Sequence, residues 1–356
     1  MTVSSWADKN LWSSTAKNLL NQAVKGILTV EAKDCSYLYW MHYIRGAARY
    51  NEPASIMRLA EVANGAQQDR IKGGSYVVSI KLSEKLKEGT IVLNEPVTQV
   101  KQNEDNVTII TKSQKQYKCK YVIMALSPML TGRIEYDPPL PSNRDELTQR
   151  FSMGRVIKCL IFYKDSFWLK KGFSGEILSE NGEFTMGFEC TLYDGKHPSL
   201  VVFICGDHAR KLSLVTENER KKKVLEELSK VFGEEAMNAI HYIDKDWLTE
   251  PYARGAYTGV CGPGVLSSLG DALRKPVGRI HWSGTETARV WSGYMEGALE
   301  SAERVALEVT NKLQGNFVEQ LKKPFPVKKD PILIDFTYIV SIGIIILSYL
   351  LYKLLS

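Results

Sequence analysis

The sequence lacks the short motifs that mark several large enzyme classes. It contains no G-x-G-x-x-G dinucleotide fingerprint, no P-loop, no H-E-x-x-H pair and no G-x-S-x-G nucleophile elbow. Its five histidines are scattered, and no cysteines and histidines share the spacing of a zinc site. These absences argue against a P-loop triphosphatase, a zinc protease and an α/β-hydrolase, and no metal is expected.

A strong charge of one sign and paired cysteines are also missing. The 46 basic and 40 acidic residues give a formal net charge of only +6 and are spread along the chain, so nucleic acid is not an expected partner. The six cysteines form no C-x-x-C pair, and no secretory signal peptide precedes them. We therefore interpret them as reduced thiols facing a cytosol-like compartment.

Long uncharged stretches are scarce, and the one that stands out is C-terminal. The segment from Phe336 to Tyr352 contains no charged residue. As a helix it would measure roughly 25 Å, close to the lower limit for crossing a bilayer. Lys328 and Lys329 precede it and Lys353 follows it. A buried core helix is the alternative, but a segment apolar on all sides after a proline- and lysine-rich linker favours a membrane anchor.

The rest of the chain has the composition of a globular protein. Its 356 residues, 44% of them hydrophobic, can bury a large core and suggest two domains with a tail. Apolar spacing predicts helices over residues 13–49, followed by a turn at 73–75 and a helix through Leu86. Next come β-rich runs at 90–102, 106–112 and 117–126. The run from Tyr121 to Leu126 is nearly all apolar, which predicts a strand buried on both faces.

The second half combines strands with two distinctive helices. A strand is predicted at 154–163, and Glu-to-Lys spacings predict an exposed helix at 217–233. RIHWSG at 279–284 predicts a strand, GTETA a turn, and residues 294–313 a long amphipathic helix. A strand, a tight turn and a helix N-terminus in this order often hold anions or electron-rich rings.

Four segments carry a resemblance to a known family. They are NGAQQDRIKGGS at 64–75, VIKCLIFYKDSFW at 156–168, DWLTEPYARGAYTGVCGPG at 246–264 and SGTETARVWSGYMEGALESAER at 283–304. In order and spacing they resemble the monoamine oxidases, within the flavin amine oxidases, and the similarity runs from near residue 1 to about 312. The C-terminal anchor also resembles the outer-mitochondrial-membrane anchor of the animal enzymes.

The resemblance implies an α+β / α/β fold that forms the C-terminal two-thirds of a two-domain FAD-dependent amine oxidase. An incomplete FAD-binding domain and a substrate domain would be followed by a transmembrane helix at about 336–352. The implied division is 1–71 (helical part of the substrate domain), 72–147 (FAD-binding part), 148–249 (substrate part), 250–312 (FAD-binding part) and 313–356 (linker and anchor).

The cofactor implied by the resemblance is FAD. The matching positions are Gly73, Gly74, Ser75, Val97, Trp247, Gly284, Thr285, Glu286, Gly293, Tyr294 and Met295. Gly293, Tyr294 and Met295 would begin the long helix, whose amides and positive end could face the N1/O2 edge of the flavin. Without the resemblance, Gly73-Gly74 would be an ordinary turn.

The resemblance also implies a substrate site and a reaction. Tyr257 and Tyr294 match an aromatic cage before the flavin, although the residues alone favour core aromatics. Lys158 lies in an apolar run and matches a lysine that holds a water against flavin N5, and Gln67 matches a glutamine lining the substrate cavity. The implied catalytic residues are Lys158, Tyr257 and Tyr294, and the implied substrate-binding residues are Gln67, Tyr257 and Tyr294.

The implied reaction oxidises a primary or secondary amine to an aldehyde while O2 is reduced to H2O2. The amine must be neutral to give up a hydride equivalent, and deprotonating an alkylamine at pH 7 costs on the order of 4–5 kcal/mol. A dry aromatic pocket would supply much of this by disfavouring the ammonium form. The chemistry therefore needs few acid–base residues.

Two departures from the family bear on activity. The family's dinucleotide-binding βαβ unit lies upstream of the matched region, so Met1 aligns with an internal position and we expect a truncated product of doubtful activity. Ala256 occupies the place of the flavin-linking cysteine, so FAD is expected to be non-covalent.

Two further interpretations stay open: a non-catalytic, tail-anchored remnant acting as a binding or scaffold module, and a polyamine or amino-acid oxidase. The expected partners are a small-molecule amine, O2 and membrane lipid, with a second copy of the chain as an open alternative. The expected location is the mitochondrial outer membrane, with the catalytic part facing the cytosol.

Overall fold

The computed structural model describes residues 1–47, 54–61, 65–180 and 182–315. The membrane anchor predicted at 336–352 lies outside these residues. Within the described ranges, no helix is long and apolar enough to cross a membrane.

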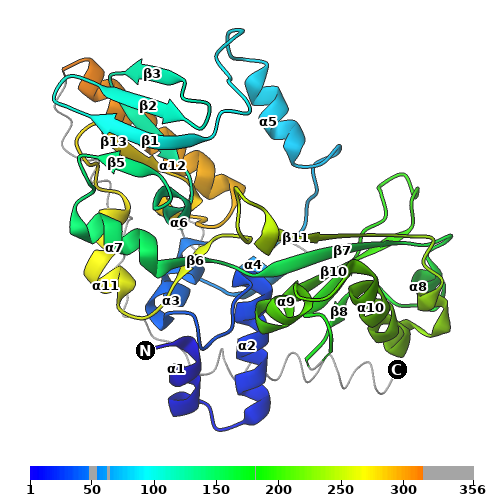
Figure 1. Cartoon of the computed structure of the whole chain (residues 1–356). Coiled ribbons are helices and arrows are strands. Elements are labelled where there is room, and N and C mark those ends of the chain that lie inside the picture. Colours follow the sequence, from blue (N-terminus) through cyan, green and yellow to red (C-terminus); the bar gives the residue numbers. More distant parts are fainter. Residues whose placement is uncertain (48–53, 62–64, 181, 316–356) are drawn as a thin grey trace.

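The chain begins with three helices, at the bottom of Figure 1. They are α1 (Val3–Asn10), α2 (Ser14–Leu28) and α3 (Tyr37–Gly46). The Ser13 hydroxyl caps α2 by accepting a hydrogen bond from the Ala16 amide, and the helix ends at Thr29 in the left-handed conformation. Val24 and Leu28, four residues apart, are buried on one face of α2. The helical prediction for residues 13–49 is thus confirmed over most of its described part, the stretch between α2 and α3 excepted.

A four-stranded sheet with the order β3-β2-β1-β5 lies at the upper left of Figure 1, beside the long helix α12 (Met295–Leu313). Its strands are β1 (Val97–Gln102), β2 (Val107–Thr111), β3 (Gln116–Cys119) and β5 (Glu135–Asp137). A separate parallel pair joins β4 (Val122–Ala125) to β13 (Ile280–Ser283). Val100, Val107 and Trp282 belong to the core that these strands share.

Two strand predictions need correction here. The strand predicted at 90–102 begins only at Val97, because Asn94 adopts a positive φ of 61° and Pro96 cannot donate a backbone hydrogen bond. The run predicted to be buried on both faces forms β4, in which buried and exposed residues alternate and Ile123 is 41% exposed. In the described residues β4 pairs only with β13, so its other edge has no partner strand there.

The second sheet has the order β11-β7-β10-β9-β8 and is antiparallel throughout. Its strands are β7 (Val156–Phe162), β8 (Ile177–Leu178), β9 (Met186–Glu189), β10 (Ser199–Cys205) and β11 (His241–Asp246). The helices α9 (Gly206–Leu212) and α10 (Glu217–Phe232) lie against it (Figure 1). The exposed helix predicted at 217–233 is confirmed as α10.

The alternation of side chains along β7 places its charged residue, Lys158, on the face away from the core. Ile157, Cys159 and Ile161 are buried in the same core as Leu228 of α10. Because side chains alternate along a strand, Lys158 lies on the opposite face, where it is half-buried.

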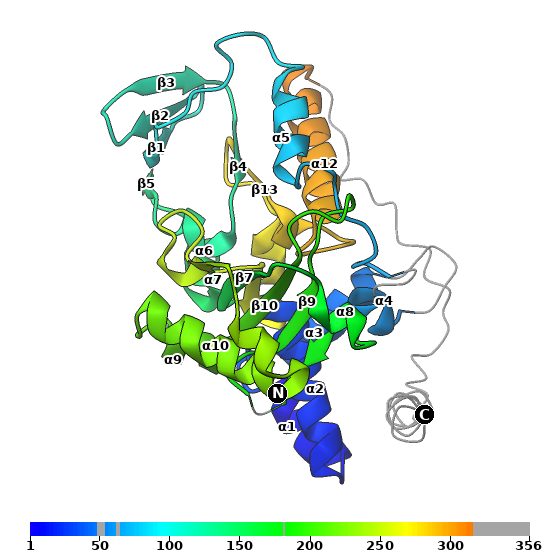
Figure 2. The ribbon, with the colours of Figure 1, turned by 90° about the vertical axis from the view of Figure 1, so that its right-hand side faces the viewer.

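The remaining elements lie outside the two larger sheets, and Figure 2 shows α6 and α7 between these sheets. They are α4 (Met57–Ala60), α5 (Tyr76–Ser83), α6 (Pro128–Thr131), α7 (Ser142–Arg150), β6 (Phe151–Met153), α8 (Phe167–Lys170), β12 (Gly259–Cys261) and α11 (Val265–Leu269). Four short 3₁₀ helices are described: η1 (Glu234–Met237), η2 (Trp247–Thr249), η3 (Gly270–Leu273) and η4 (Thr285–Thr287). Leu28, Trp40, Leu147 and Val260 share a third core that joins α2, α3, α7 and β12.

Candidate active site

An aromatic ring of β10 joins two of the predicted site residues. Phe203 lies opposite Lys158 in the β7–β10 register, and the Lys158 ammonium is 5.4 Å from the centre of its ring. The Tyr257 ring meets Phe203 edge-to-face, with centroids 6.2 Å apart. Lys158 has no hydrogen bond or ion pair to any residue that the structure describes, so its ammonium keeps its donors for other groups.

The second predicted tyrosine sits in its own aromatic cluster. The Tyr294 ring lies 6.1 Å from the Tyr43 ring of α3 and 5.3 Å from the Trp291 ring. Gly293, with φ of 85°, lets α3 come this close, since a Cβ at this position would lie 2.5 Å from the Tyr43 hydroxyl oxygen. The packing of helix α3 therefore fixes the Tyr294 side of the site.

The rings of Tyr257 and Tyr294 make no described ring contact with each other. Burial first, and then the charges that Cys205, Tyr294 and Tyr43 can carry, raise the pKa of Tyr257, so the three phenols lie within electrostatic range of one another. Burial raises the pKa of Tyr294 to about 12 and that of Tyr257 well above its ordinary value. Both phenols are neutral at pH 7. Tyr257 still keeps 40% of its surface exposed, so the region is open to a ligand on one side.

The backbone before Tyr257 is held by two contacts. The Thr29 hydroxyl donates to the Ala256 carbonyl oxygen, and the Ala256 amide donates to the Gly154 carbonyl oxygen at 3.0 Å. The Ala256–Tyr257 peptide bond is cis. A Cβ at Gly154 would overlap Thr29, so only glycine leaves room for this arrangement. The ends of α2 and β6 thus set the position of Tyr257.

The N-terminus of α12 lies beside Tyr294. The helix begins at Met295, with Tyr294 as its N-cap, slightly later than the predicted start at Gly293. No side chain caps it, and the amides of Met295 and Glu296, both exposed, have no partner among the described residues. Free first-turn amides at the positive end of a 19-residue helix form a binding site for negative charge.

The turn before this helix is fixed by internal hydrogen bonds. The Thr285 hydroxyl donates to the Tyr294 carbonyl oxygen at 2.8 Å and accepts from the Gly293 amide at 2.7 Å. Glu286 is 7% exposed, and its carboxylate accepts from the Gly259 amide at 2.8 Å and from the Thr258 hydroxyl at 3.3 Å. The side chains of Thr285 and Glu286 are thus engaged within the protein, and only their backbone remains for a ligand.

Other predicted residues lie apart from this cluster in the described contacts. Trp247 directly follows β11, whose Asp246 pairs with Ile157, so it lies near the start of β7. Gln67 is exposed and donates to the Leu59 carbonyl oxygen at 3.1 Å. The remaining positions are exposed and have no described hydrogen bond or ring contact with either tyrosine: Gly73, Gly74, Ser75 and Val97.

Sequence reasoning missed Tyr43 and Phe203. Both carried a signal. Tyr43 follows Tyr39 by four residues in the aromatic run YLYWMHY, a spacing that puts both rings on one side of a helix. Phe203 lies in the apolar run SLVVFIC, but its pairing with Lys158 depends on the β7–β10 register, which the residues do not reveal.

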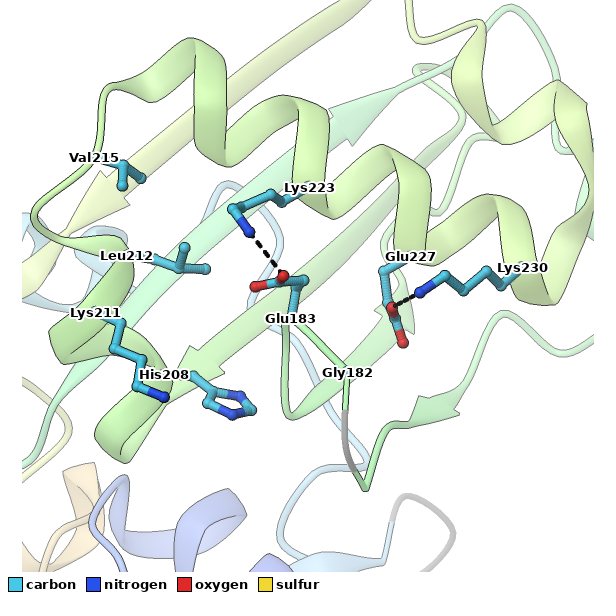
Figure 3. A pocket seen from close by; sticks show the side chains of 9 residues that line it. All are labelled: Gly182, Glu183, His208, Lys211, Leu212, Val215, Lys223, Glu227 and Lys230. Carbon is cyan, nitrogen blue, oxygen red and sulfur yellow. Dashed lines mark hydrogen bonds and ion pairs between the residues drawn. The ribbon is translucent and has the colours of Figure 1, made fainter.

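Two cavities in the described residues lie elsewhere. One, of about 470 Å³, opens between α9, α10 and Gly182 (Figure 3). The other, of about 290 Å³, lies between α2 and α9. Neither is lined by a predicted site residue.

The residues present fit one end of FAD. The free amides of α12 suit the electron-rich edge of the flavin ring, and Gly284, with φ of 103°, allows backbone to pass close to a ligand at the β13–η4 turn. The sequence holds no glycine-rich G-x-G-x-x-G loop for the pyrophosphate. The donor set therefore matches the ring end of the cofactor.

A protein-family model and several known proteins match most of this chain. A family model described as "Flavin containing amine oxidoreductase" matches residues 10–310. The chain is 40% identical over 313 residues to the "Probable flavin-containing monoamine oxidase A" of Dictyostelium discoideum, covering 88% of this chain and 67% of that protein. It is 38% identical over 341 residues to the "Amine oxidase [flavin-containing] A" of Canis lupus familiaris, covering 95% of this chain and 63% of that protein.

Solved structures are similar over the same extent. A cyclohexylamine oxidase from Brevibacterium oxydans superposes with a TM-score of 0.82 at 29% identity, covering 88% of this chain and 68% of that one. A putrescine oxidase bound to putrescine superposes with a TM-score of 0.81 at 28% identity, covering 87% and 68%. The chain thus spans about two-thirds of the length of these relatives.

Proposed function

This chain belongs to the flavin-containing amine oxidoreductase family, and from this premise we propose that it supplies the substrate side of an FAD-dependent amine oxidase. The reaction is the oxidative deamination of primary or secondary amines to aldehydes, with O2 reduced to H2O2. The observation that carries the proposal is the grouping of Tyr257, Tyr294 and Tyr43 beside the uncapped N-terminus of α12.

The tyrosines bind and orient the amine. Their phenols are neutral at pH 7, so these rings offer no negative charge to stabilise an ammonium ion. Exclusion of water between the rings lowers the pKa of the bound amine and offsets much of the roughly 4–5 kcal/mol that deprotonation costs at pH 7. When bound, FAD would supply the two-electron acceptor for the hydride equivalent from the α-carbon.

Lys158 is suited to hold a water molecule at the site. Its ammonium lies over the face of Phe203 and has no hydrogen bond or ion pair within the described part of the chain. It can therefore donate to a water on the side of the sheet that Tyr257 shares. Positive charge at this point also favours negative charge developing on O2 during reoxidation.

The free backbone amides beside Tyr294 indicate which residues would hold FAD. The amides at the start of α12 and the backbone around Gly284 and Thr285 would hold the ring end of FAD. Ala256 carries no nucleophilic atom in its side chain, so the flavin would be bound without a covalent link.

The substrate class is an aryl- or alkylamine. Phe188, Phe203 and Tyr257 form a series of edge-to-face rings, with 6.2 Å between the centroids of each successive pair. A diamine, as putrescine is in one related oxidase, needs a carboxylate for its second ammonium. Within the described residues no hydrogen bond links a carboxylate to Tyr257, the polar member of this series, which favours a monoamine over a polyamine.

The location follows from the sequence. Residues 336–352 would anchor the protein in a membrane, as the uncharged run and its flanking lysines support. The mitochondrial outer membrane, with the catalytic part facing the cytosol, is what the resemblance of this segment to the anchor of the animal enzymes implies. The non-catalytic remnant is the less favoured interpretation, because the aromatic cluster and the free helix amides are both retained.

The test is amine-dependent peroxide formation. The chain is expressed behind the N-terminal FAD segment of a family member and assayed with benzylamine, cyclohexylamine and putrescine. Flavin reduction by benzylamine or cyclohexylamine, with peroxide released in air, is the expected result. Bound flavin that none of the three amines reduces would overturn the proposed activity.

A further inference from the structure

Two arginines from separate elements hold the β13–η4 turn, which comprises residues 284–288. Arg274 directly follows η3, and Arg304 lies in the middle of α12. The turn includes Gly284 and Thr285, whose backbone would hold the ring end of FAD. Neither arginine was expected at the site from the sequence, so their contacts show how the fold supports this turn.

Arg274 donates two hydrogen bonds to the backbone of the turn. Its Nε donates to the Thr287 carbonyl oxygen at 2.6 Å, and its Nη2 donates to the Ala288 carbonyl oxygen at 2.9 Å. Hydrogen bonds from a charged donor are roughly twice as strong as those between neutral groups. Because the guanidinium is planar and rigid, it fixes the two successive carbonyl groups relative to each other.

Arg304 holds the same turn from the side of α12. Its Nη2 donates to the Trp282 carbonyl oxygen and to Thr287 Oγ1, both at 2.9 Å. Its Nη1 pairs with Glu308, four residues further along the helix, at 2.8 Å. The Thr287 hydroxyl in turn donates to the Gly284 carbonyl oxygen at 2.8 Å. Arg304 therefore ties the end of β13 to the far side of the turn.

Arg274 differs from Arg304 because no ion pair joins it to any residue that the structure describes. Burial, and then the charges of Arg304 and Arg289, lower the pKa of Arg274, whereas the charge of Glu300 acts in the opposite direction. A guanidinium nevertheless stays protonated in proteins. Both side-chain hydrogen bonds of Arg274 within the described residues go to the turn, so a salt bridge does not account for its position.

The turn is coupled to the groups that would contact the cofactor and the amine. Thr285, two residues before Thr287 in η4, donates to the Tyr294 carbonyl oxygen and accepts from the Gly293 amide. Gly284 has a positive φ of 103°, a conformation that glycine adopts without strain. A displacement of the Thr287 peptide would therefore reach both Thr285 and the N-terminus of α12.

We propose that Arg274 is a positioning residue for the cofactor, whose guanidinium holds the β13–η4 turn in the conformation that binds the ring end of FAD. It acts through the carbonyl groups of Thr287 and Ala288 rather than by touching the amine. The inference rests on the proposed function for the identity of the ligand. It does not require that any particular amine reduce the flavin.

The test uses the chain fused behind the N-terminal FAD segment of a family member. FAD is titrated into the flavin-free fusion, and flavin fluorescence gives the dissociation constant. We expect Arg274→Met to weaken FAD binding about tenfold or more, because two charge-assisted hydrogen bonds to the turn are lost. Arg274→Lys keeps the charge but not the planar fork, so its loss of affinity should be smaller.

Arg279→Met is the matched control. Arg279 is half-buried like Arg274, and its guanidinium also donates to two backbone carbonyl oxygens, those of Glu104 and Lys120. It precedes β13, at the end of the strand opposite to the turn. The control removes the same charge and the same kind of hydrogen bond, and it should keep the wild-type affinity for FAD.

Two further readouts separate positioning of the turn from a general loss of stability. Amide hydrogen exchange over residues 284–291 of the flavin-free fusion should be faster in Arg274→Met than in the wild type and unchanged in Arg279→Met. At saturating FAD, the visible spectrum of the bound flavin should shift only in the Arg274 variants, because the surroundings of the ring change.

The outcomes distinguish this inference from the proposed function. Wild-type affinity and exchange in Arg274→Met, or an equal loss of affinity in Arg279→Met, overturns the role of Arg274. If Arg274→Met does not fold, Arg274→Lys takes its place, and wild-type affinity there has the same meaning. A wild-type fusion whose flavin no amine reduces contradicts only the proposed activity, whereas a folded fusion that binds no FAD contradicts both.

Discussion

The Tyr43 hydroxyl occupies the space that a side chain at Gly293 would need, with its oxygen 2.5 Å from the position of a Cβ there. Gly293 also has a positive φ of 85°, and its amide donates to Thr285 Oγ1 at 2.7 Å. Helix α3 and the turn before α12 therefore fit together only because residue 293 is glycine. This contact sets the position of Tyr294, the next residue along the chain.

Gly293→Ala should disturb both stability and the site. A positive φ strains alanine by roughly 1–3 kcal/mol, and the added Cβ must also displace Tyr43. We expect a lower melting temperature and slower flavin reduction by amine in an enzyme that has a complete FAD-binding domain. Gly89→Ala is the control, because Gly89 has a φ of 78° with open space around it. Equal effects of the two substitutions would show that the Tyr43 contact is unimportant.

The aromatic cage gives a second prediction. In an enzyme with its full FAD-binding domain, Tyr257→Ala or Tyr294→Ala should slow flavin reduction on the order of a hundredfold while flavin stays bound, because the amine is no longer oriented. Tyr257→Phe and Tyr294→Phe keep the rings and should be milder. Stopped-flow absorbance measures the reduction step, and flavin content of the purified protein is the control. Loss of flavin in step with loss of rate would assign the tyrosines to cofactor binding instead.

Lys158→Met should act on the oxygen half of the reaction. Its ammonium has no described ion pair and lies where negative charge would develop on O2, so removing it should slow reoxidation of reduced enzyme about tenfold or more and leave reduction by amine nearly unchanged. Rapid mixing of reduced enzyme with aerated buffer measures this step. Lys245→Met is a matched control, because Lys245 pairs with Lys158 in the β11–β7 register but forms an ion pair with Glu250. Unchanged reoxidation in Lys158→Met would remove this residue from the mechanism.

The sequence revealed different parts of the fold to different degrees. Apolar spacing predicted the helix α2 and Glu-to-Lys spacings predicted α10, and the structure shows that Ser13 and Thr216 cap their first turns. The strand predicted at 90–102 was too long, because the positive φ of Asn94 is not visible in a run of β-formers. Burial on both faces of β4 was wrong, because an apolar run does not reveal whether a neighbour covers it.

The candidate site, like the fold, was predicted only in part from the sequence. Lys158, Tyr257 and Tyr294 were singled out through family resemblance, whereas composition alone favoured core aromatics. Tyr43 and Phe203 were missed, because their contacts join α3 to the α12 turn and β10 to β7 across long sequence separations. Such contacts depend on tertiary packing and sheet register, which periodicity does not specify.

The membrane anchor gives a prediction that rests on sequence alone, since residues 336–352 lie outside the described structure. In a fusion that carries the N-terminal FAD segment of a family member, deleting the residues after Asp330 should release the protein from membranes without unfolding it, because the uncharged run is removed and the described fold ends before it. Sedimentation of membranes after a high-salt wash measures release. Replacing Lys328 and Lys329 by Gln in the full-length chain is the control, and that variant should stay in the pellet. A deleted form that still pellets would contradict the anchor.

The 356-residue polypeptide by itself is expected to retain little FAD. The pyrophosphate of FAD carries two negative charges, which the family neutralises with a glycine loop and a helix N-terminus in a βαβ unit. The sequence holds no G-x-G-x-x-G, and Ile123 of β4 and Met295 and Leu299 of α12 leave apolar surface exposed. This polypeptide expressed alone should therefore aggregate readily, retain little FAD and form no amine-dependent peroxide.

Fusing the N-terminal FAD segment of a family member ahead of Met1 should restore a yellow protein, because the ring end of the cofactor already has its amides at α12. Denaturation followed by filtration should then release the flavin into solution, since Ala256 offers no side-chain nucleophile for a covalent bond. An Ala256→Cys version of the same fusion tests whether a thiol at this position suffices to retain flavin in the denatured protein. Stoichiometric flavin in the unfused polypeptide, or flavin that stays attached to the Ala256 fusion after denaturation, would contradict this account of how the chain holds its cofactor.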